Sequence, residues 1–152
     1  MKTCVVYDSQ FGNTERIAQA IAEALSAAGP ARAVRASQAQ AAELGDVDLL
    51  IIGSPTVAWK PTPPVQAFLQ GLSAASLGRL RIACFDTRMH LPFFMSRSAG
   101  EVMAKRLKAL GAEPLLPPEG FWVKGREGPL QDGELERAAE WARTLRDRYE
   151  SA

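Results

Sequence analysis

The stretch SQFGNT, residues 9–14, has the residue types of a turn that binds an anion. It joins a short apolar segment, residues 3–7, to a segment whose apolar residues have helical spacing. Backbone N–H groups, hydroxyl and amide side chains, and the positive end of the following helix together suit a phosphate. The chain has neither a GxGxxG nor a GxxxxGK(S/T) pattern, so the turn favours one terminal phosphate over a dinucleotide or a nucleoside triphosphate. Capping of the helix is the alternative role of these residues.

A second turn with ligand-binding residue types follows the apolar segment VDLLIIG, residues 47–53. It begins with Ser54, Pro55 and Thr56, and Trp59 lies three residues further on. An aromatic ring at this place could stack on a planar ligand. The alternative for Trp59 is an exposed loop aromatic that the neighbouring prolines hold in place.

The elements that must position these turns alternate along the chain. We expect strands at residues 3–7, 31–37, 47–53, 80–86 and 120–123. Helical spacing between them predicts four helices, the first ending at Gly29 and the last beginning near Asp132. The run at 47–53 is apolar at nearly every position, which is typical of a strand covered on both faces, and the segment at 31–37 reads as an edge strand.

Such an alternation predicts parallel pairing with right-handed crossovers, and therefore an α/β fold with a three-layer, doubly wound sheet. Five strands favour the strand order 2-1-3-4-5 in one domain over residues 1–152. In this arrangement the strand order switches between the first and third strands, while all strands stay parallel. Ligands bind at that switch point, where the turns at 9–14 and 54–59 would meet.

Bulk composition excludes several other classes of function. Lys and Arg number 18 against 17 acidic residues, so charge indicates neither nucleic acid nor a strongly basic partner. No apolar run approaches the roughly 20 residues of a membrane span, and we expect a cytoplasmic protein. Cys4 and Cys84 fall within predicted strands two positions apart in the sheet, so we expect buried thiols that are too distant for a disulfide. A solitary His90 argues against a zinc site.

The motifs SQFGNT and GSPT, with an aromatic residue a few positions later, resemble the flavodoxin family, whose members bind flavin mononucleotide (FMN). The resemblance covers essentially the whole chain and implies three binding loops. Their residues are implied to be Ser9, Gln10, Phe11, Gly12, Asn13 and Thr14 around the phosphate; Pro55, Thr56, Val57, Ala58 and Trp59 beside the flavin; and Phe85, Asp86, Thr87, Arg88 and His90 in the third loop.

Two positions depart from the family pattern. Phe11 stands where the family usually has Ser or Thr, which removes one hydroxyl donor. The third loop lacks the Tyr that often covers the outer flavin face, so His90 or Phe93 would take that position, or the face would stay open. Arg16, Lys60 and Arg88 in or beside the loops predict a less negative potential for full reduction of the flavin than in an acidic flavodoxin.

The resemblance leaves three functions to weigh. The first is an electron carrier between a reductase and an acceptor protein, acting as a monomer or weak dimer. The second is an FMN-dependent oxidoreductase of the quinone- or protoporphyrinogen-oxidising kind, with a substrate on an open flavin face. The third is a module without flavin; a phosphoacceptor receiver domain is set aside because it needs an Asp where this chain has Gly53 and Ser54.

Overall fold

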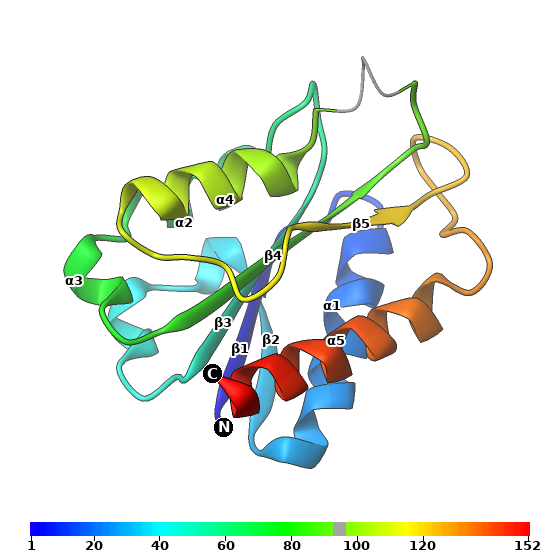
Figure 1. Ribbon diagram of the computed structural model, residues 1–152. Coiled ribbons are helices and arrows are strands. Elements are labelled where there is room, and N and C mark those ends of the chain that lie inside the picture. Colours follow the sequence, from blue (N-terminus) through cyan, green and yellow to red (C-terminus); the bar gives the residue numbers. More distant parts are fainter. Residues whose placement is uncertain (93–96) are drawn as a thin grey trace.

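A five-stranded parallel sheet forms the centre of the molecule, as the sequence predicts (Figure 1). The computed structural model describes residues 1–92 and 97–152. Neighbouring strands lie in the order β2-β1-β3-β4-β5. The strands are β1 (Thr3–Tyr7), β2 (Ala31–Arg35), β3 (Leu49–Pro55), β4 (Arg81–Arg88) and β5 (Glu119–Trp122). This order confirms the predicted doubly wound fold.

Helices cover both faces of the sheet (Figure 1). One face carries α1 (Asn13–Leu25) and α5 (Glu134–Ser151). The opposite face carries α2 (Pro63–Gln70), the one-turn helix α3 (Ala74–Leu77) and α4 (Ala99–Ala109). Short 3₁₀ segments at 26–28, 36–38 and 41–44 complete the connections. The result is the three-layer arrangement expected for βα units.

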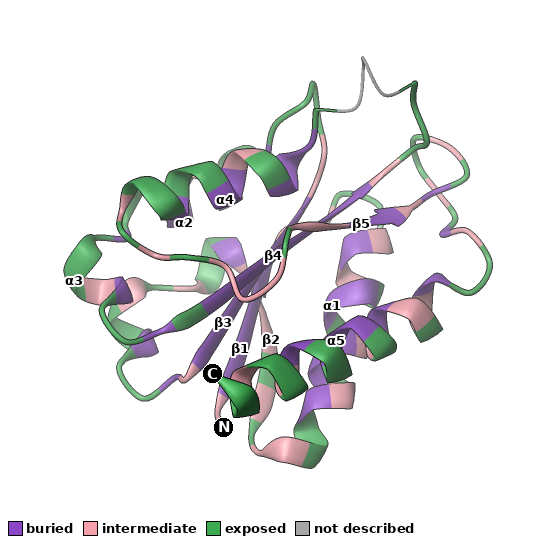
Figure 2. Ribbon diagram, viewed as in Figure 1, coloured by how far each residue is buried: buried purple, intermediate pink, exposed green. Residues whose placement is uncertain are grey.

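The central strands are buried on both faces (Figure 2). Successive side chains of a strand point to opposite faces, so Val5 and Ile51 pack toward α1 and α5, while Val6 and Ile52 pack toward α2 and α4. The edge strand β2 is only partly buried. The central strands are apolar at consecutive positions because a layer of helices covers each face of the sheet, as the sequence predicts.

Element boundaries differ from the sequence expectation by a few residues. The first helix ends at Leu25 and continues as 3₁₀ turn to Ala28, and β4 continues to Arg88. The last helix begins at Glu134 because Gly133, at φ 83°, forms a left-handed turn before it. No helix in residues 1–92 or 97–152 is long and apolar enough to cross a bilayer.

The two cysteines are buried and free, which confirms the prediction. Cys4 lies in β1 and Cys84 in β4, with β3 between them. Burial raises the pKa of both thiols, and that of Cys84 reaches about 12.

Candidate functional site

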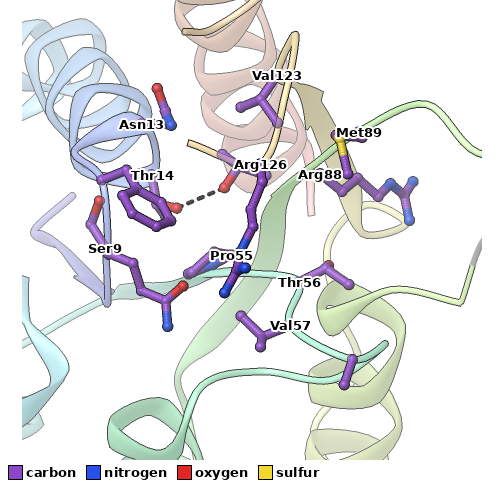
Figure 3. A pocket seen from close by; sticks show the side chains of 14 residues that line it. Ser9, Asn13, Thr14, Pro55, Thr56, Val57, Arg88, Met89, Val123 and Arg126 are labelled. Atoms are coloured by element: carbon purple, nitrogen blue, oxygen red, sulfur yellow. Dashed lines mark hydrogen bonds between the residues drawn. The ribbon is translucent and has the colours of Figure 1, made fainter. Parts of the chain in front are cut away.

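A cavity of about 340 Å³ opens at the carboxyl ends of the central strands (Figure 3). This volume is in the range of small-molecule sites. It lies where the strand order switches, between β1 and β3. The loops after β1, β3, β4 and β5 supply the lining residues, which are Ser9, Gln10, Phe11, Asn13, Thr14, Pro55, Thr56, Val57, Ala58, Thr87, Arg88, Met89, Val123 and Arg126.

The turn after β1 is built to leave backbone donors unpaired. Ser9 Oγ accepts hydrogen bonds from the N–H groups of Gly12 and Glu15, at 3.1 and 3.2 Å, and Gly12 adopts the left-handed conformation at φ 90°. In residues 1–92 and 97–152, no hydrogen bond is found for the N–H groups at positions 10, 11, 13 and 14. Four donors thus remain at the start of α1, where the helix dipole also favours an anion.

Two polar side chains of this turn tie it to other segments. The hydroxyl groups of Thr14 and Thr87 are 2.7 Å apart and buried, so they link α1 to the end of β4 (Figure 3). Asn13 Nδ2 donates to the carbonyl oxygen of Glu127 at 3.1 Å, which links α1 to the loop after β5. The loop after β5 therefore forms part of the cavity wall, although it belongs to neither SQFGNT nor GSPT.

The turn after β3 holds two non-glycine residues in the left-handed region. Ala58 has φ 49° and Trp59 has φ 63°. The turn closes through hydrogen bonds between Val57 and Lys60 in both directions, at 2.9 and 3.1 Å. Left-handed backbone costs an L-residue about 1–2 kcal/mol, and such strain concentrates at functional sites. Trp59 is 48% exposed and lies outside the cavity lining, so its stacking on a ligand stays a prediction.

Two of the predicted residues are buried in β4 and do not line the cavity. Phe85 is fully buried and packs edge-to-face against Phe121 at 5.9 Å between ring centroids. Asp86 is also buried, and its Oδ2 accepts from Gly100 N–H at 2.9 Å. Burial raises the pKa of Asp86, while Arg88, with Nε 3.5 Å from Oδ1, acts in the opposite direction.

His90 is stacked on Trp122, with ring centroids 3.6 Å apart and planes inclined by 24°. The guanidinium of Arg88 lies over the same indole, 5.1 Å from its centroid. The structure therefore does not bring His90 to the cavity, and the stack explains why. Phe93, the other candidate for covering a flavin, lies outside the described residues.

The structure brings together most of the residues that the sequence singled out. Five of them do not line the cavity: Gly12, Trp59, Phe85, Asp86 and His90. Sequence reasoning missed three that do: Met89, Val123 and Arg126. Met89 lies next to a predicted residue, and the topology alone carries the segment VKGREGPL, residues 123–130, to the same edge of the sheet, because it follows the last parallel strand.

Comparison with known proteins agrees with this geometry. The family model described as flavodoxin matches residues 5–141. Among solved structures, a flavodoxin from the domain Archaea is 21% identical, with 99% of each chain covered and a TM-score of 0.80. Oxidised flavodoxin 1 from Bacillus cereus is 17% identical, with 97% of this chain and 98% of the other covered and a TM-score of 0.78.

A larger protein contains a similar unit. Rubredoxin oxygen:oxidoreductase from Desulfovibrio gigas is 22% identical, with a TM-score of 0.79; 99% of this chain is covered but only 36% of that one. At these identities the likeness to solved structures concerns the fold. None of the curated proteins compared with the chain matches it. The family match over residues 5–141 shows that the chain belongs to the flavodoxin family, whose members bind FMN and transfer electrons to redox partners.

Proposed function

We propose that the protein is an electron carrier that holds FMN in the cavity and docks briefly with a reductase and an acceptor protein. FMN, when bound, supplies one- and two-electron redox chemistry. The residues of this chain supply binding, orientation and charge. The turn at 9–14 would hold the phosphate, and the segment 55–58 with Thr87 and Arg88 would border the rest of the cofactor.

The donor set of the cavity fits FMN. A phosphate monoester needs several hydrogen-bond donors, and the turn offers four N–H groups with no partner in the described part of the chain, together with the hydroxyl group of Ser9. Beyond this turn the lining becomes largely apolar, with Pro55, Val57 and Val123. A polar end and an apolar body match a ligand that has a phosphate at one end and an aromatic ring system at the other.

One observation supports a carrier in particular. Among the described residues, the large hydrophobic side chains that are exposed all lie in or next to the three predicted binding loops, and they are 39–48% exposed. We call this set the apolar rim: Phe11, Val57, Trp59, Met89 and Leu91. Three of them line the cavity. Exposed apolar side chains gathered around a site mark a surface that another protein covers, and redox encounters need only a small one.

A cytochrome c reduction assay tests the proposal. The protein is loaded with FMN and added to NADPH, a ferredoxin reductase and cytochrome c. We expect cytochrome c reduction to require the loaded protein. Leu91→Ser, which alters the apolar rim outside the cavity lining, should slow the transfer about five- to tenfold, which corresponds to roughly 1–1.4 kcal/mol of docking energy, with FMN affinity unchanged.

Tyr149→Ser serves as the matched control, because Tyr149 lies near the end of α5, away from the cavity. Equal rates for wild type and Leu91→Ser would count against docking at the rim. A protein that binds no FMN would end the proposal itself.

The second candidate is an FMN-dependent oxidoreductase, and the position of His90 favours it. Since His90 stacks on Trp122, no aromatic side chain of residues 88–92 lines the cavity, and one side of a bound flavin would be open to a small aromatic substrate. Turnover of NAD(P)H with quinones in the absence of any reductase distinguishes this enzyme from a carrier. A carrier should show no quinone-dependent oxidation above the rate of free FMN.

A further inference from the structure

Arg126 is a cation in the cavity wall that neither motif of the sequence includes. It lies in the loop between β5 and α5, and its side chain runs from this loop across the cavity toward Pro55 (Figure 3). Within residues 1–92 and 97–152, Arg126 forms no hydrogen bond or ion pair. A guanidinium that reaches into this cavity, with no partner among the described residues, is available to a ligand.

The loop that carries Arg126 is fixed at both ends. Val123 and Leu130 form an antiparallel bridge, and Lys124 N–H donates to the carbonyl oxygen of Pro129 at 2.8 Å. Gly128 N–H donates to the carbonyl oxygen of Gly125 at 3.0 Å, which closes a tight turn with Arg126 inside it. The position of Arg126 is therefore set by a small hydrogen-bonded hairpin and not by a free loop.

Contact with α1 sets where this hairpin lies. Asn13 Nδ2 donates to the carbonyl oxygen of Glu127, the residue next to Arg126. Gly128, at φ 104°, packs closely against Asn13: a Cβ at this position would lie only 2.6 Å from Asn13 Oδ1. Asn13 thus belongs to the phosphate turn and also contacts the loop that carries Arg126 into the same cavity.

Charge gives Arg126 a specific task. The side chains at positions 9–14 are all neutral, whereas a phosphate monoester carries up to two negative charges. The nearby carboxylates of Asp8 and Glu15 face Arg35, at 3.9 and 2.8 Å, so they have a cation of their own. A guanidinium offers the planar, two-donor geometry that phosphate oxygens accept.

We propose that Arg126 is a cofactor-positioning residue that binds the phosphate of FMN from the side opposite the turn at 9–14, with Asn13 holding its loop in place. This inference rests on the proposed function, because it concerns the same cavity. It adds the segment 123–130 as a fourth binding loop and makes Arg126 the residue that selects the phosphorylated flavin over the unphosphorylated one.

Affinities for FMN and riboflavin, measured by flavin fluorescence titration, test the proposal. The two ligands differ only in the phosphate. In Arg126→Gln we expect FMN affinity to fall at least tenfold, equivalent to 1.4 kcal/mol, and riboflavin affinity to stay within twofold. The FMN affinity of Arg126→Lys should lie between those of wild type and Arg126→Gln. The FMN affinity of wild type should fall more steeply with salt concentration than that of Arg126→Gln. Arg143→Gln removes the same charge from the exposed face of α5 and is the matched control.

Each outcome bears on one claim. If Arg126→Gln loses affinity equally for FMN and riboflavin, Arg126 does not bind the phosphate. If its affinities for both flavins equal those of wild type, Arg126 takes no part in binding. If wild type binds neither flavin, the proposed function fails instead. Asn13→Ala should cost little further FMN affinity in the Arg126→Gln background; additive losses would contradict its role in holding the loop. Circular dichroism melting of the apoproteins verifies that each variant is folded.

Discussion

In the described part of the chain, two carboxylates are buried against arginines, and the two pairs differ in their hydrogen bonding. At the start of α5, Glu134 accepts hydrogen bonds from Arg137 Nη2 at 2.6 Å, from Arg137 Nε at 2.9 Å and from Trp122 N–H at 2.7 Å. Near the end of β4, Asp86 Oδ2 accepts a hydrogen bond from Gly100 N–H at 2.9 Å, and Oδ1 lies 3.5 Å from Arg88 Nε, with no hydrogen bond to Oδ1 found within residues 1–92 and 97–152. The first pair is bidentate and the second is not.

The pKa values follow this geometry. Burial pushes the pKa of Glu134 upward, but the hydrogen bonds from Arg137 and Trp122 outweigh it and hold the pKa below its ordinary value. Burial prevails at Asp86, whose pKa is raised despite Arg88 and Gly100. A carboxylate that is fully hydrogen-bonded to its arginine stabilises the fold. The incompletely paired one precedes Thr87 and Arg88 in β4, and both of these residues line the cavity.

Removal of the well-paired arginine should have the largest effect. Arg137→Gln leaves Glu134 buried with a single backbone donor and also breaks the 2.9 Å pair with Glu119. We expect the free energy of unfolding to fall by about 2–3 kcal/mol, measured by urea denaturation. Arg146→Gln, which breaks an exposed pair with Asp147, should cost less than about 0.5 kcal/mol. Equal effects of the two variants would contradict the distinction.

A methyl group at Gly120 should disturb the pair between Asp86 and Arg88, because it would contact the guanidinium of Arg88. Gly120 lies opposite Asp86 in the sheet, and a Cβ there would be 2.6 Å from Arg88 Nη2. Gly120→Ala should therefore displace the guanidinium and lower the free energy of unfolding by about 1–2 kcal/mol. Gly45→Ala is the control, because a Cβ at Gly45 meets nothing within 4 Å. If Gly120→Ala unfolds at the same urea concentration as wild type, the guanidinium has room to move at no cost.

The charge of Arg88 should appear in the reduction potential of bound FMN. A cation beside the cavity stabilises the negative charge that reduction brings, so Arg88→Ala should make the potential for full reduction more negative, by the equivalent of about 1 kcal/mol. Potentiometric titration of both proteins measures the shift, and Arg88→Lys should retain most of the wild-type value. An unchanged potential in Arg88→Ala would remove Arg88 from the electrostatics of the site.

The smallest expected effect is a pH dependence of stability. The raised pKa of Asp86 means that the folded state binds a proton more readily than the unfolded one, so this group lowers stability as pH rises above about 4. Glu134, whose pKa is lowered, contributes with the opposite sign and loses its stabilisation as pH falls. Asp86→Asn keeps an acceptor for Gly100 N–H. Between pH 4 and 8, its free energy of unfolding should increase relative to that of wild type by up to about 1 kcal/mol. Denaturation midpoints at several pH values measure this difference, and parallel curves would show that Asp86 titrates normally.

The fold was predictable because consecutive apolar residues report burial on two faces, as in 47–53, and the strand count selected the order. The site was predictable where short motifs carry it, as with residues 9–14. The rest depends on contacts between distant segments. The hydrogen bond from Asn13 to Glu127 joins positions 114 residues apart, and together with the hairpin at 123–130 it sets where Arg126 lies. Likewise, no spacing in the sequence indicates that His90 stacks on Trp122.

The buried state of Cys4 and Cys84 has a practical consequence for studying docking. A thiol that is inaccessible and protonated does not react with maleimides, so the native fold offers such reagents no cysteine of its own. A cysteine introduced beside the apolar rim would then be the sole attachment point for a spin label or fluorophore. Partner association could be followed at that position directly, with the wild-type chain as an unlabelled blank.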